Sequence, residues 1–138
     1  MNKMKKDIET RADINNLLNS FYAKAMVDEV IGYIFIEVAK LDLELHLPII
    51  GDFWETLLFG TGGYQKYGRN PMQIHAQLNE ETPLRTEHFR RWLDLFYATV
   101  DELFVGERAE MAKFRAGAIA DRMLIFVTGN ESLEASVK

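Results

Sequence analysis

The sequence has no cysteine, and this absence excludes several kinds of site. Without thiols the chain cannot form disulfides, ligate zinc or iron–sulfur clusters through thiolates, use a cysteine nucleophile or attach a cofactor through thioether bonds. Proteins of reducing compartments commonly lack disulfides, so we expect a cytoplasmic location.

Proline, long apolar runs and positive charge are also scarce. Three prolines and short runs of β-branched residues favour helices over a β-sandwich or barrel. No segment approaches the roughly 18 to 20 unbroken apolar residues that span a membrane, and Met1–Thr10 lacks the apolar core of a signal peptide. With 16 basic and 21 acidic residues, the net charge of −5 offers no footprint for nucleic acid or anionic lipid, so we expect neither as a partner.

The remaining composition is that of one folded domain. A chain of 138 residues fits a single hydrophobic core, and its apolar share of 48% is typical of folded proteins. The sequence shows no repeat and no linker. We therefore expect one domain over residues 1–138, with its core at about 13–127 and mobile ends.

Apolar residues recur at three- and four-residue intervals nearly throughout, which predicts an all-α fold. The expected helices run from about Asp13 to Met26, over Ile31–Lys40, from near Leu45 with Pro48 in the first turn, from Met72 to about Leu78, from near Thr86 to Phe104, and from about Glu107 to Val127. The glycine-rich stretch from Gly60 to Pro71 is expected to be irregular.

Three histidines are the candidate metal ligands, although a single histidine is more often a surface or core residue. His75 lies on the short helix next to Ile74, whereas His88 stands among charged residues and is expected to be exposed. His46 begins the helix after Leu45. No two histidines have the spacing of a helix-borne zinc site, and no nucleophile elbow is present, so a zinc hydrolase and a serine hydrolase are both disfavoured.

Tyr22 and Trp92 are polar aromatics that belong to apolar helical stripes. Each therefore needs an inward partner for its O–H or N–H group. Spacing alone leaves two interpretations open: hydrogen bonds to backbone carbonyls in an ordinary helical core, or a polar function inside a binding pocket.

Several ordered segments together resemble one protein family. They are Ser20-Phe21-Tyr22, Ile31-Gly32-Tyr33-Ile34-Phe35, His46-Leu47-Pro48, Phe53-Trp54-Glu55, Asn70-Pro71, His75 and the run from His88 to Phe96. This order, spread from about Asp13 to Ala120, resembles the truncated haemoglobins, specifically their group III (P) subfamily. The longer stretch between Gly60 and Asn70 departs from the family pattern.

The resemblance implies a two-over-two helical sandwich around non-covalent haem b. It implies that His75 ligates the iron and that Tyr22, His46 and Trp92 line the distal, ligand-binding side. The candidate porphyrin contacts, each of which could equally be ordinary core, are Phe21, Phe35, Ile50, Phe53, Trp54, Leu78, Leu93 and Phe96.

The expected function is binding of O2, and also of CO or NO, at the haem iron. Oxygen transport is among the roles that the resemblance implies, although two hydrogen-bond donors on the ligand slow its release and suit tight retention or redox conversion better. Two alternatives remain open. One is an enzyme that converts NO or peroxide with electrons from an unidentified reductase, and the other is a cofactor-free helical interaction module.

Overall fold

The described part of the chain is entirely helical. A computed structural model describes residues 4–61 and 84–128, and the predicted all-α class is confirmed there. Its elements are α1 (Arg11–Ala25), the π-helix η1 (Ile34–Val38), α2 (Leu43–Phe59), α4 (Thr86–Leu103) and α5 (Glu107–Thr128). Within these ranges the backbone pairing between strands is limited to an isolated bridge between Lys6 and Phe104.

Helix α1 begins two residues earlier than its apolar stripe predicts. Thr10 is its N-cap: the Thr10 hydroxyl accepts a hydrogen bond from the amide of Asp13, and the Asp13 carboxylate accepts one from the amide of Thr10. This reciprocal capping box satisfies two amides that a helix end leaves without partners. The cap fixes where the buried stripe of α1 starts, which carries Ile14, Leu17, Leu18, Phe21, Tyr22 and Ala25.

The prediction for the start of α2 was wrong by about two residues. Asp42 accepts a hydrogen bond from the amide of Glu44 at 3.0 Å, so the helix begins at Leu43. Pro48 therefore lies in the second turn of α2 and not in the first. In the second turn its missing N–H leaves the carbonyl one turn earlier without the usual helical donor. The helix ends at Gly60, whose φ of +74° is a left-handed conformation that glycine adopts without strain.

The predicted helix over Ile31–Lys40 is shorter and wider than its spacing indicates. The structure has a π-helix from Ile34 to Val38, closed by a 2.7 Å hydrogen bond from the amide of Ala39 to the carbonyl of Ile34. Such turns carry an extra residue, so a 3.6-residue pattern does not describe them. Ile34 is buried, and Phe35 packs beside it against the core.

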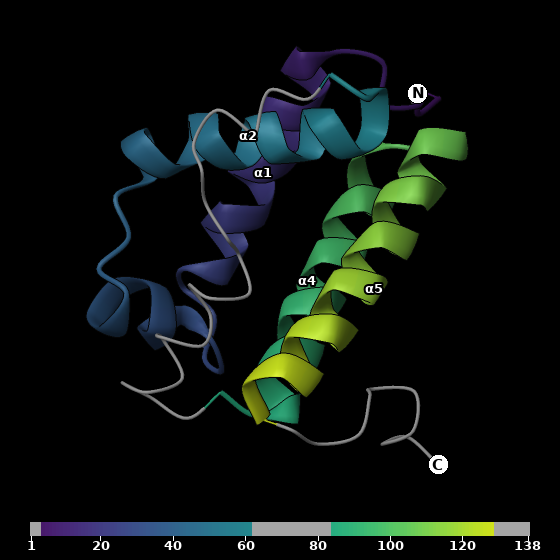
Figure 1. The fold of residues 1–138 in the computed structure, drawn as a ribbon. Coiled ribbons are helices and arrows are strands. Elements are labelled where there is room, and N and C mark those ends of the chain that lie inside the picture. The colour runs from purple at the N-terminus through teal and green to yellow at the C-terminus, as the bar shows by residue number, and fades with distance from the viewer. Residues whose placement is uncertain (1–3, 62–83, 129–138) are drawn as a thin grey trace.

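The helices pack as two pairs (Figure 1). Helices α1 and α2 contact each other, as do α4 and α5, and the pairs meet through the contacts of α1 with α4 and of α2 with α5. Small residues at the buried positions of α5 permit its close approach to α4. They are Ala109, Ala112, Ala116 and Ala120.

The segment before α1 fastens the α4–α5 connection. The Asp7 carboxylate accepts hydrogen bonds from the amides of Arg108 and Ala109, so it caps α5 from about a hundred residues away. Ile8 is fully buried in the same segment.

None of the helices within residues 4–61 and 84–128 is long and apolar enough to cross a membrane.

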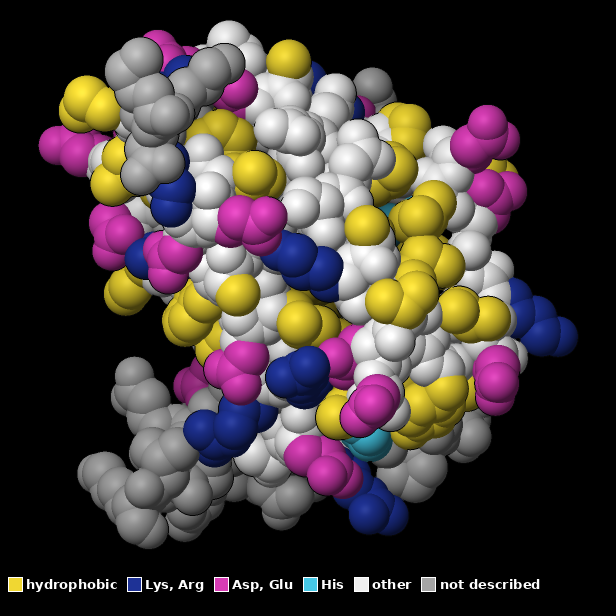
Figure 2. All heavy atoms as spheres, turned by 180° about the vertical axis from the view of Figure 1, so that it is seen from behind, with side chains coloured by type: hydrophobic (Ala, Val, Ile, Leu, Met, Phe, Trp, Pro, Cys, Tyr) yellow, Lys and Arg dark blue, Asp and Glu magenta, His cyan; other side chains and the backbone are white. Residues whose placement is uncertain are grey.

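Large apolar side chains remain exposed near η1 and the start of α2. Tyr33, Ile36 and Leu45 are among them. On the face seen from behind, hydrophobic side chains are interspersed with acidic and basic ones (Figure 2). Charges of both signs therefore border the apolar surface on this face.

Candidate functional site

A partly buried hydrogen bond joins α1 to α2. The hydroxyl oxygen of Tyr22 lies 2.9 Å from Nε2 of His46, and the two rings stand at 89° to each other. Tyr22 is only 6% exposed, and this burial raises the pKa of its hydroxyl. The phenol therefore keeps its proton at neutral pH and is available as a hydrogen-bond donor.

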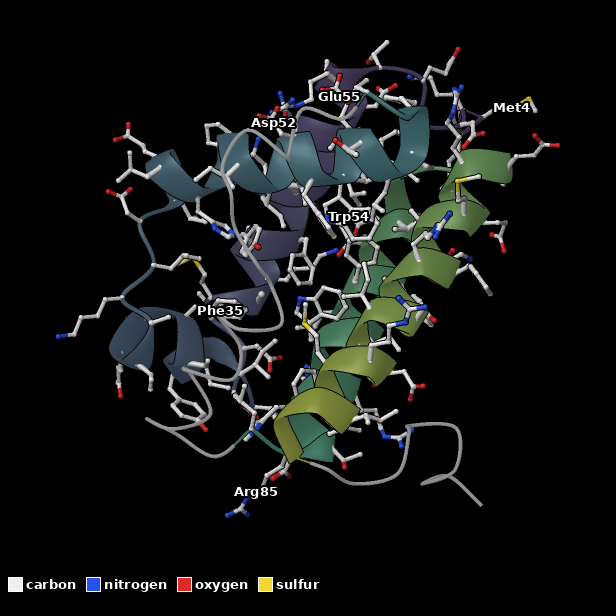
Figure 3. All side chains as sticks on the ribbon, viewed as in Figure 1. Met4, Phe35, Asp52, Trp54, Glu55 and Arg85 are labelled. Carbon is white, nitrogen blue, oxygen red and sulfur yellow. The ribbon has the colours of Figure 1, made fainter. Side chains whose placement is uncertain are left out.

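Aromatic rings surround Tyr22 on both sides. Its ring lies 5.1 Å from that of Phe21 and 6.0 Å from that of Phe35, both in edge-to-face contact. Phe35 comes from η1, so the π-helix contributes directly to this cluster. In Figure 3 the Phe35 side chain points from η1 toward the interior of the molecule. The edge-to-face contacts fix the orientation of the phenol ring.

Trp92 on α4 continues the cluster. Its ring contacts Phe21 at 5.9 Å and stacks on Phe96 at 5.6 Å, and Phe96 stacks in turn on Trp54 of α2 at 4.9 Å. Figure 3 shows Trp54 pointing from α2 into the space between the helices. Four elements, α1, η1, α2 and α4, thus present aromatic rings to one region, which we call the aromatic cluster: Phe21, Tyr22, Phe35, Trp54, Trp92 and Phe96.

The predicted porphyrin contacts fall into two groups by burial. Phe21, Trp54 and Phe96 are almost fully enclosed and pack against one another. The second group is half-buried and keeps accessible surface: Phe35, Ile50, Phe53 and Leu93. A flat ligand needs such accessible surface, so the second group fits direct contact better and the first fits a supporting layer.

The structure brings the three predicted distal residues into one region. Tyr22 and His46 are hydrogen-bonded, and Phe21 contacts both Tyr22 and Trp92. His75 and Leu78 lie outside the described residues, as do the helix expected from Met72, residues 1–3 and residues 129–138. The assignment of His75 as iron ligand therefore stays a prediction. The N-terminal end before residue 13 was expected to be mobile, but its described part is held by the buried Ile8 and by the hydrogen bonds of Asp7.

His88 has a structural partner of its own. Its Nδ1 accepts a hydrogen bond from the amide of Arg85 at 3.0 Å, which caps the start of α4, and its Nε2 lies 3.4 Å from the hydroxyl of Tyr33. The ring is half-buried and not exposed as expected. Burial lowers the pKa of His88, and Arg85 adds to this effect against the opposing charge of Glu87. These contacts identify His88 as a helix cap.

No cluster of three or more histidine, cysteine or acidic side chains within residues 4–61 and 84–128 could hold a metal ion. A porphyrin provides four nitrogen ligands itself and needs one protein ligand, so a site of that kind does not require such a cluster.

Sequence reasoning missed an ion-pair network between the start of α1 and the middle of α2. Nη1 of Arg11 lies 2.6 Å from the Asp52 carboxylate and 3.0 Å from that of Glu55, and Nη2 donates to the carbonyl of Pro48 at 3.1 Å. Residues more than thirty positions apart have no local spacing pattern, so only the tertiary structure reveals the network.

Comparisons with known proteins agree on one family, although no family model matches the chain. The chain is 30% identical over 120 residues to a group 3 truncated hemoglobin from Campylobacter jejuni, which covers 85% of this chain and 90% of that protein. The crystal structure of a group III truncated hemoglobin from Campylobacter jejuni superposes with a TM-score of 0.76 at 28% identity, covering 90% of this chain and 95% of that one. The two helix pairs are therefore the two layers of a truncated-globin sandwich, and the chain belongs to the group III truncated haemoglobins.

Proposed function

We propose that the chain binds haem b beside the aromatic cluster and retains a diatomic ligand, O2 first among them, through Tyr22, His46 and Trp92. The observation that carries this proposal is the hydrogen bond between the buried Tyr22 and the half-buried His46 in a chain of this family. An ordinary helical core gains little from burying the phenol hydroxyl, because it loses its hydration and needs a partner.

The described residues fit a haem group. The half-buried Phe35, Ile50, Phe53 and Leu93 offer apolar surface from η1, α2 and α4, and the rings packed behind them give that surface a rigid support. Haem supplies an iron atom at which a diatomic ligand binds, with His75 as the proposed protein ligand. The neutral imidazole donates an electron pair, and its second nitrogen needs a hydrogen-bond acceptor to fix the ring.

Tyr22, His46 and Trp92 would hold the ligand. The Tyr22 hydroxyl is protonated and positioned by His46, so it can turn its O–H toward a ligand that carries partial negative charge. The indole N–H of Trp92 is a second donor. Each such bond contributes about 1 to 3 kcal/mol in a dry pocket, so two donors favour slow release over rapid oxygen transport.

Conversion of NO or peroxide is the second candidate function. The Tyr22–His46 pair favours it because a phenol bonded to an imidazole can hold and pass on a proton at the ligand. This function also needs an electron donor such as a reductase. Stopped-flow loss of NO with formation of nitrate, measured against free haem, tests it; a rate equal to that of free haem counts against it.

Titration of the purified full-length chain with hemin tests the main proposal. We expect a Soret band that saturates at one haem per chain and shifts when the reduced protein is exposed to CO. A chain that stays colourless with hemin in slight excess would reject haem binding and favour the interaction-module alternative.

A further inference from the structure

Arg11 of α1 makes a set of polar contacts to α2 that the proposed function does not use. Its guanidinium bonds two carboxylates and one carbonyl of α2, while its Nε donates to Asn15 within α1 at 3.0 Å. The Arg11 side chain is 30% exposed, and those of Asp52 and Glu55 are 14% and 25% exposed. The pair network is thus partly shielded from water, where ion pairs are screened less than on an open surface.

Arg11, Leu18 and Tyr22 lie on one face of α1. They are seven and four positions apart, which at 3.6 residues per turn places them in a single stripe. Arg11 contacts α2 at one end of this stripe, and Tyr22 contacts His46 at the other. One helix face therefore makes both polar attachments to α2.

The surface between the two attachments is open. A groove of about 240 Å³ lies there, lined by Arg11, Asn15, Leu18, Asn19, Leu47 and Pro48. An open groove contributes few packing contacts, so along this stretch the two polar attachments add to the packing of α2 against the core.

The Arg11 guanidinium lies directly against Gly51. A Cβ atom on Gly51 would lie 2.5 Å from Nη2 of Arg11, so the Arg11 side chain would have to shift to make room for it. Figure 3 shows Asp52 and Glu55 on the side of α2 where α1 begins, and Trp54 on the side that faces the aromatic cluster. Gly51, Asp52 and Glu55 thus form a contact site for the Arg11 guanidinium, which we call the seat of Arg11. It lies on the opposite side of α2 from Trp54.

We propose that Arg11, seated on Gly51, Asp52 and Glu55, is a positioning residue that keeps His46 of α2 within hydrogen-bond distance of Tyr22. The Arg11 attachment thereby fixes the part of α2 from which His46 reaches Tyr22. Its functional part rests on the proposed ligand-binding role of the Tyr22–His46 pair. A lysine keeps the charge but lacks the fork that reaches three acceptors.

Four variants separate positioning from stability. Arg11→Met keeps the aliphatic stem and removes the guanidinium, and Arg11→Lys restores the charge alone. Gly51→Ala displaces Arg11 while it raises the helix propensity of α2, so it should not lower the unfolding midpoint. Lys24→Met is the matched control, because Lys24 also starts from α1 but pairs with Thr99 and Glu102 of α4.

Two measurements need no haem. Hydrogen exchange of α2 amides in the full-length chain should rise roughly 10-fold in Arg11→Met and Gly51→Ala but not in Lys24→Met. The 13C shift of the Tyr22 ring carbon that bears the hydroxyl should move in the same two variants, because that carbon reports the bond to His46. Arg11→Lys should lie between the wild type and Arg11→Met.

With haem bound, the C–O stretching band should broaden or shift in the same two variants, and the O2 off-rate should rise about 10-fold. In a Tyr22→Phe background, Arg11→Met should add nothing to the off-rate, since the residue that it positions against is gone. Unchanged α2 exchange and an unchanged Tyr22 signal would overturn the proposal. The proposal would also be overturned if Arg11→Met and Gly51→Ala raised the exchange of α2 amides but kept the same C–O band and O2 off-rate as Lys24→Met. Failure of the wild type to bind haem would instead reject the proposed function, and the two haem-free measurements would then decide the positioning role alone.

Discussion

The hydroxyl of Tyr22 and Nε2 of His46 are 2.9 Å apart although 24 positions separate the residues. The caps at Thr10 and Asp42 set where the two helices begin, and hence where each ring emerges. Because Tyr22 is buried, its O–H is removed from water and depends on a partner inside the protein. Substitutions at this pair should therefore change ligand release more than they change folding.

Tyr22→Phe should leave haem binding intact and raise the O2 off-rate by roughly 10- to 100-fold, the equivalent of about 1 to 3 kcal/mol. Stopped-flow replacement of O2 by CO measures this rate. Tyr33→Phe is the matched control, since it removes a hydroxyl that lies near His88 instead of His46. Equal off-rates in the wild type and Tyr22→Phe would remove Tyr22 from the ligand-binding role.

His75→Ala should abolish tight haem binding, because it removes the proposed iron ligand. The Soret intensity after gel filtration of the hemin-treated chain measures the loss. The control is His88→Ala, which should retain haem because His88 caps α4 and contacts Tyr33. Added imidazole should restore part of the Soret band of His75→Ala. A His75→Ala protein that keeps full haem content would place the iron ligand elsewhere.

Helical periodicity predicted the long elements well. Helices α4 and α5 begin at the expected residues, Thr86 and Glu107, because wide apolar stripes must face the core whatever the neighbours are.

Features that depend on packing or on distant residues could not be predicted from the sequence pattern. The π-helix at Ile34–Val38 was expected as part of a longer ordinary helix, because two adjacent residues pack inward there through a widened turn. The start of α2 was misplaced because Asp42, and not Pro48, determines it. The family resemblance placed Tyr22 and His46 on one side of the pocket, but the hydrogen bond between them was not predicted. The seat of Arg11 was missed because the residues that form it have no local spacing.

Asp7→Ala should lower the free energy of unfolding by about 0.5 to 2 kcal/mol, because the amides of Arg108 and Ala109 lose their cap. Urea denaturation measures the loss. Glu107→Ala is the control, since it changes an exposed carboxylate at the same helix end and should cost less than about 0.5 kcal/mol. Equal losses of unfolding free energy in the two variants would mean that the hydrogen bonds from Asp7 do not stabilise the start of α5.

His88 should make stability depend on pH between about 5 and 7. Its pKa is lowered in the folded chain, mainly by burial, so the unfolded chain binds a proton first as the pH falls below about 6.5. Stability is therefore lost with falling pH, because a protonated Nδ1 cannot accept the Arg85 amide. His88→Gln keeps an acceptor that does not titrate, and its stability should change less over this range in urea titrations. Parallel curves for the two proteins would contradict this assignment.

Asp28 should contribute stability that acid removes. One of its carboxylate oxygens accepts Nε and Nη2 of Arg91 at 2.8 and 2.6 Å, and the other accepts the amides of Val30 and Ile31. The Asp28 side chain is 4% exposed, so its carboxylate depends on these donors to replace the water that it has lost. The hydrogen bond from Arg91 is the largest cause that lowers the pKa of Asp28, and the two amides add to it against the effect of burial.

The sign follows from this shift. The unfolded carboxylate takes up its proton near pH 4 and the folded one at lower pH, so the stabilisation is complete above pH 4 and is lost as the pH falls through the folded pKa. Asp28→Asn should cost about 1 kcal/mol or more at pH 7, because an amide cannot accept at both ends, and its stability should fall less steeply between pH 5 and 2. Arg91→Met, which leaves the two backbone amides paired, should cost less than Asp28→Asn. If the two variants lost the same stability, the cap on Val30 and Ile31 would contribute nothing and the Arg91 pair alone would account for Asp28.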